Sequence, residues 1–395
     1  MSKKRSHADD LRGATRLVVE ATRGVMELVQ AMQVASMSGP AILGRPLEGP
    51  AKLVTGIVHG TSKGITRLVG SAIDGALEQL SPLLGSSIPG PERDAVQGAL
   101  NGVLGDYLRD QANPLAVEMR LRRGGAPLDL MPEALRRAIP DATTKLVILV
   151  HGSCATDHLW LRAGHDHGAA LFRDLGLTPI YLHYNSGLHI STNGRELSGL
   201  LEQLLAAWPV EIDDLVLLGH SMGGLVARSA CHTAERASHA WRDKLSTLIT
   251  LGSPHHGAPL ERGGNWLQFL LGVSRFSAPF ARLGRIRSAG ITDLRFGNIL
   301  DEHWEGRDRF AVGDDPRAPL GLPASVRSFA VAASLTEAPD DRLRGDGVVP
   351  VDSALGRHTD AERTLAFADE AIVTGSKHLD LLGAPTYEHV RRWLR

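Results

Sequence analysis

The chain has 395 residues, which is more than one ordinary domain usually needs, and its 43 Lys and Arg nearly balance its 44 Asp and Glu. This balance gives no electrostatic reason to expect a nucleic acid partner, and two cysteines, Cys154 and Cys231, are too few for a disulfide framework. The basic start is followed by acidic residues rather than an apolar segment, and no run of about 18 apolar residues occurs, so we expect neither a secretory signal nor a transmembrane helix. A cytoplasmic protein is the default expectation, with contact to a membrane surface left open.

Residues 1–112 are predicted to form helices that take no part in the chemistry. Apolar residues recur at helical spacing over 17–32 and 54–80, with glycines interspersed. Each glycine costs a helix about 1 kcal/mol relative to alanine, so these helices need close packing or a surface for stability. A helical hairpin that packs on the rest of the chain, or on a second copy in a homo-oligomer, is the favoured interpretation. Helices that lie on a lipid surface are the alternative.

From residue 113 to the end, short apolar runs alternate with helical stretches and glycine-rich turns. This alternation predicts a single α/β domain with a mostly parallel sheet and helices on both faces. The predicted strands are an opening hairpin over 115–130, followed by 146–150, 179–184, 214–218, 245–251, 326–332 and 370–374; the predicted helices include 193–208 and 222–236.

Between residues 258 and 323 the strand pattern stops and large apolar side chains accumulate. An insertion between two late strands would lie at the carboxyl edge of the sheet, where ligands bind in open α/β folds. We therefore expect a cap that contacts the substrate through Trp266, Phe269 and Leu270. A packed helical subdomain without substrate contact is the alternative.

The sequence around Ser221 predicts a nucleophile. An apolar strand, the turn Gly219-His220-Ser221-Met222-Gly223 and an apolar helix follow one another, which is the context that the G-x-S-x-G nucleophile elbow requires. Small residues at both ends let the turn be tight enough to expose the serine hydroxyl at the top of the sheet. A purely structural turn is the alternative.

An oxyanion hole is predicted from two backbone N–H groups, because two donors are needed where the tetrahedral intermediate develops its charge. One is assigned to Met222, the residue after the nucleophile. The other is assigned to Ser153, which follows His151-Gly152 at the end of a predicted strand. Cys154 is the alternative for the second donor.

The acid and the base are expected after the serine, in the chain order serine, acid, histidine. His378 follows the last predicted strand and is the expected base. Asp346 is the expected acid because glycines flank it, with Asp340 and Asp341 as competing carboxylates and a turn-capping role as the alternative. The pair His255 and His256 precedes any candidate acid and is expected to line the substrate pocket.

These residues resemble the α/β-hydrolase lipases and esterases, and most of all the bacterial proteins related to the PGAP1-like group. The resemblance runs from about residue 113 to the end and implies an α/β-hydrolase fold, hydrolysis of carboxylic esters, often with an apolar acyl chain, and no cofactor. The motifs that carry it are His151-Gly152, 219–224, 250–257, 345–350 and 377–380.

No metal site is expected. Secreted bacterial lipases of similar pattern hold calcium near the catalytic histidine, with an aspartate two residues after it, and Asp380 occupies that position. However, no second aspartate occurs some twenty residues before Asp346, so we expect Asp380 to cap the helical turn after His378.

The sequence therefore predicts a serine hydrolase that cleaves small-molecule or lipid esters through Ser221, Asp346 and His378. An acyltransferase or thioesterase that uses the same triad is one alternative. A non-catalytic lipid-surface or scaffold protein is the alternative from another class, which a missing triad member would favour.

Overall fold

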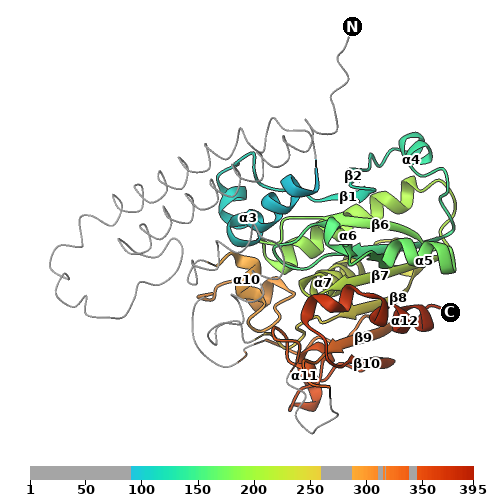
Figure 1. The fold of residues 1–395 in the computed structure, drawn as a ribbon. Helices are drawn as coiled ribbons and strands as arrows, with labels where there is room; N and C mark the ends of the chain where they lie inside the picture. The colour runs from blue at the N-terminus through green and yellow to red at the C-terminus, as the bar shows by residue number, and fades with distance from the viewer. Residues whose placement is uncertain (1–89, 259–286, 310–314, 316, 338–344) are drawn as a thin grey trace, which may run out of the picture.

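The computed structural model describes residues 90–258, 287–309, 315, 317–337 and 345–395. Its centre is an eight-stranded sheet in the spatial order β2-β1-β6-β3-β7-β8-β9-β10 (Figure 1). The strands are β1 Arg120–Arg123, β2 Ala126–Pro127, β3 Lys145–Val150, β6 Thr178–His183, β7 Asp214–His220, β8 Leu245–Leu251, β9 Arg327–Ala333 and β10 Asp369–Val373.

The strand directions identify the architecture. β1 pairs antiparallel with both β2 and β6, and the remaining neighbours from β6 to β10 are all parallel. An antiparallel hairpin that leads into a parallel sheet with this order of crossovers is the α/β-hydrolase fold. The fold class expected from the sequence is confirmed.

Helices cover both faces of the sheet. In β3 the side chains of Leu146, Ile148 and Val150 join one core and those of Val147 and Leu149 join the other, as the two-residue period of a strand requires. The first core is closed by α3 Pro91–Asp110, α6 Ile190–Ala207 and α7 Met222–Ala237; the second is closed by α5 His167–Leu175 and α12 Ala384–Trp393 (Figure 1).

The connections carry short elements. A second, two-stranded ribbon pairs β4 with β5. The short elements in the connections are α4 Pro132–Ala138, η2 Asp157–Trp160, β4 Leu161–Arg162, β5 His165–Asp166, α8 Trp241–Lys244, α10 Ala289–Asp293, η4 Asp301–His303, α11 Val351–Ala354, η5 Ala361–Arg363 and η6 His378–Leu382.

Helix α3 belongs to the hydrolase core, although it precedes the boundary expected at residue 112. Leu100, Leu104 and Leu108 on this helix are at most 1% exposed and pack in the same core as the sheet. The boundary at 112 therefore does not separate two cores within the described part of the chain, and the expected helical extension can only comprise residues before α3.

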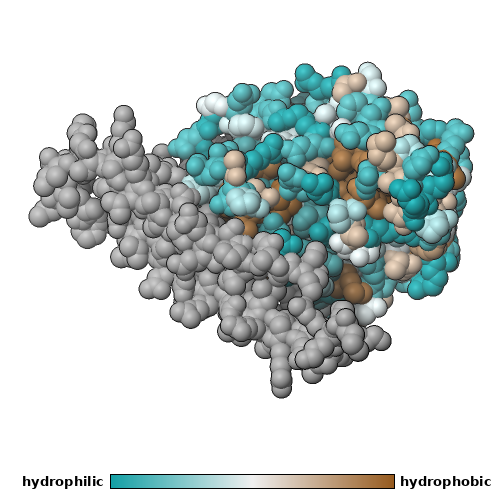
Figure 2. Space-filling view, turned by 90° about the horizontal axis from the view of Figure 1, so that it is seen from above, coloured by the Kyte–Doolittle hydropathy of each residue, from teal (hydrophilic) through white to brown (hydrophobic). Residues whose placement is uncertain are grey.

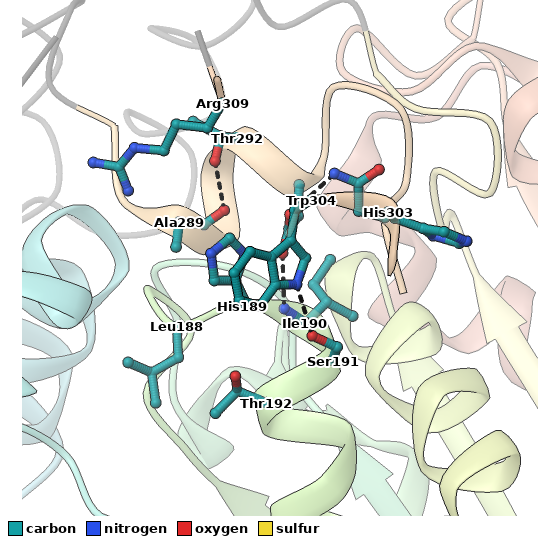
Figure 3. A network of polar contacts seen from close by, with 12 residues as sticks. Leu188, His189, Ile190, Ser191, Thr192, Ala289, Thr292, His303, Trp304 and Arg309 are labelled. Atoms are coloured by element: carbon teal, nitrogen blue, oxygen red, sulfur yellow. Dashed lines mark hydrogen bonds and ion pairs between the residues drawn. The ribbon is translucent and has the colours of Figure 1, made fainter. Parts of the chain in front are cut away.

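Part of the expected cap insertion, residues 287–309, packs at the start of α6 (Figure 3). The rings of His189 and Trp304 stack at 3.7 Å with an interplanar angle of 4°, and Trp304 Nε1 donates to Ser191 Oγ. Asp293 Oδ2 accepts from the backbone N–H of Ile190 at 2.9 Å. This segment is thus fixed to the hydrolase domain by specific contacts.

The described surface gives no sign of a membrane span. None of the helices in the described ranges combines the length and the hydropathy that crossing a bilayer requires. Figure 2 shows one face on which hydrophilic residues predominate and hydrophobic residues form small separate areas.

Candidate active site

Ser221 occupies a strained turn between β7 and α7. Its backbone has φ 54° and ψ −125°, a conformation that is costly for a residue with a side chain and that clusters at functional sites. The strain is held by two hydrogen bonds: Ser221 N–H donates to Leu251 O at 2.8 Å, and Gly224 N–H donates to Ser221 O at 3.1 Å. The turn therefore has the geometry of a nucleophile elbow.

The flanking glycines are required by close approach of backbone atoms. A Cβ on Gly219 would lie 2.4 Å from the nitrogen of Gly224, and a Cβ on Gly223 would lie 2.1 Å from the carbonyl oxygen of Val150. Both distances are far below any real Cβ contact. The elbow can form only because glycine stands at these two positions.

Asp346 and His378 form a buried pair. Asp346 Oδ2 lies 2.6 Å from His378 Nδ1, and both residues are 3% exposed. The other oxygen of Asp346 accepts from the backbone N–H groups of Val348 and Val349 at 2.9 and 2.8 Å. The structure thus brings together the acid and the base that the sequence predicted.

The pair lies beside the elbow. Gly252, directly after β8, approaches the histidine so closely that a Cβ there would lie 3.3 Å from His378 Nδ1. His220, the residue before the nucleophile, donates from Nε2 to the carbonyl oxygen of His378 at 3.3 Å, and the two rings lie 4.9 Å apart. Burial lowers the pKa of His220 well below 6.5, so its ring is neutral. Sequence analysis assigned His220 no role, because contact with a backbone atom 158 positions away leaves no sequence pattern.

The loop after β3 lies against the nucleophile. A Cβ on Gly152 would be 3.0 Å from Ser221 Cβ. The loop is held by Tyr184, whose hydroxyl donates to His151 O at 2.9 Å. Cys154 N–H donates to Ser186 Oγ at 3.0 Å, and this bond occupies the alternative oxyanion donor.

Ser153 and Met222 remain as candidate oxyanion donors. Met222 is the first residue of α7, so its N–H has no partner within the helix. Ser153 lies in the turn between Gly152 and Cys154, and its N–H makes no hydrogen bond to any other described residue. Both N–H groups are thus available to a substrate oxygen.

The predicted substrate-binding residues divide into two sets. His255 and His256 line a hollow with Arg228 and His303 on the flank of α7. The cap residues and the competing acids lie outside the described residues: Trp266, Phe269, Leu270, Asp340 and Asp341.

Asp380 caps the turn that follows the base. Its Oδ2 accepts from the backbone N–H of Lys377 at 2.9 Å, at the start of η6. The capping role predicted for Asp380 is confirmed.

One cluster has the composition of a metal site. Asp94, Asp157 and His158 bring their ligand atoms within 4.8 Å of one another. However, Arg122 Nη1 donates to both carboxylates, at 2.7 and 2.9 Å. The guanidinium supplies the positive charge that a cation would bring, so we interpret the cluster as a buried ion-pair network.

Comparison with known proteins finds a family whose model matches part of the chain. Residues 200–313, which contain the elbow, match the family model described as a PGAP1-like alpha/beta domain. This match covers the elbow and less than a third of the chain. The resemblance stated from the sequence is confirmed.

Two curated proteins are similar to parts of this chain. A GPI inositol-deacylase of Debaryomyces hansenii is 42% identical over 62 residues, which are 16% of this chain and 6% of that protein. GPI inositol-deacylase B of Yarrowia lipolytica is 26% identical over 149 residues, or 38% of this chain and 12% of that protein. The chain therefore matches only a small fraction of the length of either relative.

Solved structures with a related fold include the mature lipase BlEst2 of Bacillus licheniformis, with 15% identity, a TM-score of 0.41, and coverage of 63% of this chain and 91% of that one. An esterase of Pyrococcus furiosus has 14% identity and a TM-score of 0.38, over 64% of this chain and 82% of that one. Similarity at this level does not extend to substrate or activity.

Proposed function

We propose that the PGAP1-like chain hydrolyses carboxylic esters, of lipid or acyl type, with Ser221 as nucleophile, His378 as base and Asp346 as acid. The observation that carries this proposal is the buried contact of 2.6 Å between His378 Nδ1 and Asp346 Oδ2, beside an elbow that holds Ser221 at φ 54°.

In the first half-reaction, Ser221 Oγ attacks the carbonyl carbon of the ester and its proton passes to His378 Nε2. Because Asp346 accepts a hydrogen bond from Nδ1–H, the neutral histidine presents a basic Nε2. The same carboxylate stabilises the imidazolium that forms. His378 then gives the proton to the leaving alkoxide, which departs as an alcohol.

The backbone supports the charge that develops on the substrate. The N–H groups of Met222 and Ser153 are the proposed donors to the carbonyl oxygen as it becomes an oxyanion. Fixed donors of this kind need no reorganisation during the reaction. The positive end of the α7 dipole adds to their effect.

In the second half-reaction, His378 takes a proton from water as the water oxygen attacks the carbonyl carbon of the acyl-serine. The bond from that carbon to Ser221 Oγ then breaks, His378 returns the proton to Oγ, and the acid is released. An alcohol or amine in place of water would give acyl transfer from the same intermediate. A thioester would enter by the same route.

The acyl type of the substrate is supported by the relatives, whose names describe deacylases. A deacylase removes an acyl group, which matches the acyl-serine chemistry above. The identity of the alcohol and the length of the chain are the open variables of the proposal.

A panel of p-nitrophenyl esters of increasing acyl length tests the proposal. Each buried CH₂ contributes at most about 0.8 kcal/mol, so kcat/KM should rise over several carbons and fall once the pocket is full. Hydrolysis should persist without an acceptor alcohol. Turnover that requires an added alcohol would instead identify a transferase, and no turnover of any ester would contradict the proposal.

A further inference from the structure

The hollow on the flank of α7 that His255 and His256 line can be examined as a binding site in its own right. It encloses about 330 Å³ including its open mouth, and its polar lining is basic: Arg228, Arg317, Arg363, His255, His256 and His303. Arg228 is seven residues beyond Ser221 on the same helix, about 10 Å along the axis at 1.5 Å per residue. None of Ser221, Asp346 and His378 is among the residues that line the hollow.

Arg228 is a buried cation without a carboxylate partner among the described residues. It is only 5% exposed. Its Nη2 donates to the carbonyl oxygen of Leu320 at 2.8 Å and its Nη1 to His255 Nδ1 at 3.2 Å, while its Nε is buried and makes no hydrogen bond to a described residue. Burial and the charge of Arg317 lower the pKa of Arg228 to about 9, so it still carries its charge at neutral pH. A buried charge without a counter-charge is costly.

The two other arginines share one carboxylate. Arg317 binds Asp315 with two of its nitrogens, and Arg363 Nη1 lies 3.0 Å from the same carboxylate. Among the described residues, the three guanidinium groups are offset by the carboxylate of Asp315 and, at 3.6 Å from Arg363, by that of the half-exposed Asp360, so positive charge remains in excess.

The histidines add a donor and an acceptor. His303 Nδ1 accepts from Ile299 N–H, so its neutral ring carries the proton on Nε2, which is buried and has no hydrogen bond in the described structure. His256 Nε2 donates to Gly356 O, which leaves its buried Nδ1 as an acceptor. Burial lowers the pKa of His303 and of His256 to about 4, so both rings are neutral at neutral pH.

We infer that this hollow binds a phosphoryl group that retains one P–OH, such as hydrogen phosphate or a phosphomonoester. Its oxygens accept from Arg228 Nε and His303 Nε2, and its hydroxyl donates to His256 Nδ1. A phosphate anion offsets this excess of positive charge, and arginine is well suited to phosphate.

Titration calorimetry on the full chain, at constant ionic strength, tests this inference with inorganic phosphate, methyl phosphate and sulfate. We expect one phosphate site per chain, with sulfate clearly weaker because it has no proton to donate to His256 at neutral pH. Binding of methyl phosphate would identify a phosphomonoester as an acceptable source, and binding of inorganic phosphate alone would identify the free ion. Equal binding of sulfate, or no binding of phosphate at millimolar concentration, would overturn the assignment.

Variants locate the binding. Arg228→Met should weaken phosphate binding about tenfold or more, because a charge-assisted hydrogen bond is lost. Since Arg228 also holds the carbonyl of Leu320, Arg363→Gln at the rim is the second variant and should weaken binding severalfold in a folded protein. Arg236→Gln is the matched control on the exposed side of α7, where the side chain is 70% exposed, and should bind as the parent does. Unchanged binding in both pocket variants would contradict the inference.

The site is independent of ester hydrolysis. Ser221→Ala should therefore bind phosphate with unchanged affinity, whether or not the parent protein turns over esters. Loss of phosphate binding in a folded Ser221→Ala protein would place the anion at the elbow and contradict this separate site.

Discussion

Asp346 uses its two oxygens for two different purposes. Oδ1 accepts from two backbone N–H groups, which fixes the carboxylate, and Oδ2 accepts from His378 Nδ1. This division explains why glycines flank the residue: Gly345 and Gly347 have φ values of 79° and 91° and turn the chain around it. A carboxylate fixed in this way holds the histidine in one tautomer.

Asp346→Asn tests that role. The amide oxygen can keep the two backbone bonds, so the NH₂ group would face His378 and favour the tautomer with its proton on Nε2, which cannot accept the serine proton. We expect kcat for a p-nitrophenyl ester to fall on the order of 10³–10⁴-fold with little change in the urea midpoint. Asp352→Asn, on an exposed side chain nearby, is the control. Nearly normal turnover in Asp346→Asn would show that another carboxylate is the acid.

The ion-pair network around Arg122 makes stability depend on pH. Burial alone would raise the pKa of Asp94, but hydrogen bonds from His158 and Arg122 bring it below 3.8. Burial also opposes the lowering of the Asp157 pKa, which results from the contact with His183 Nδ1 at 3.2 Å and from the charge of Arg122. The stability that these carboxylates contribute is present above pH 3.8 and is lost as pH falls through their folded pKa. His158 acts in the opposite sense: its hydrogen bond to Asp94 raises its pKa above 6.5, so its contribution is present below 6.5 and is lost as pH rises through the folded pKa.

Arg122→Met should therefore lower the free energy of unfolding by about 3–5 kcal/mol near neutral pH, because it leaves two buried carboxylates without their cation. Urea unfolding over a series of pH values should show this loss shrink in acid, as the carboxylates become protonated. Arg136→Met, which removes an exposed pair with Glu133, should change stability by less than about 1 kcal/mol. A loss for Arg122→Met that is the same at every pH would contradict the network.

At the scale of elements, α3 supports the oxyanion loop directly. Its glycines face the loop after β3: a Cβ on Gly102 would lie 2.6 Å from Cys154 Cα, and a Cβ on Gly98 would lie 2.8 Å from Ala155 O. The helix can approach this loop only because it carries glycine there. The contact links a helix in the first third of the chain to the position of Ser153.

Gly102→Ala tests this support. The added methyl group must displace the loop, so we expect a loss of about 1–3 kcal/mol in stability and a fall of about tenfold or more in kcat. Gly199→Ala is the matched control within α6, where a Cβ would meet nothing within 4 Å; it should gain about 0.4–1 kcal/mol with unchanged kcat. Unfolding curves and ester kinetics on both variants measure these effects, and normal kcat in a folded Gly102→Ala protein would contradict the link.

Periodicity and motif context predicted the elements that hold the chemistry. The predicted runs 146–150, 214–218 and 245–251 match β3, β7 and β8 within two residues, because buried parallel strands are continuous apolar runs. The helices α5 and α12 were not predicted: they span nine and ten residues, too few turns for a clear period. The place of α3 in the core was also missed. Small residues predict a weak helix from the sequence, and they give no indication that the helix packs closely against another part of the chain.

The basic hollow shows a different limit of sequence analysis. Arg228, Arg317 and Arg363 come from three separate segments, and only the fold brings them together. One signal was present: Arg228 interrupts the otherwise apolar and small residues of a helix that is buried next to the nucleophile. A charged residue in such a helix needs a partner of opposite charge or a ligand, and the sequence alone therefore indicated that Arg228 required one.

For the whole molecule, the structure changes which parts of the chain are expected to support catalysis. Residues 1–112 were expected to take no part in the chemistry, but their deletion would remove α3 with its buried leucines and its contacts to the oxyanion loop. We now expect deletion of 1–112 to abolish soluble expression or ester turnover. Deletion of 1–89 should retain turnover on short esters, as circular dichroism and ester kinetics on both proteins would show. Equal activity of the two truncated proteins would contradict a structural role for α3.

The remaining expectations for the N-terminal segment stay predictions. Contact of residues before α3 with a lipid surface, assembly with a second copy of the chain, and a cytoplasmic location concern residues or properties outside the described structure. Comparing the protein that lacks 1–89 with the full chain in vesicle binding and in sedimentation tests the first two.

The central claim is that Ser221 forms the acyl-enzyme intermediate. The most direct measurement is mass spectrometry of the peptide that contains Ser221 after reaction with a serine-directed phosphonate, together with the rate of ester hydrolysis in the same sample. The account predicts stoichiometric labelling of Ser221 with parallel loss of activity, no labelling in Ser221→Ala, and a fall in its kcat on the order of 10⁴-fold or more. Ester turnover that survives in a correctly folded Ser221→Ala protein, or a phosphonate found on another residue, would contradict it.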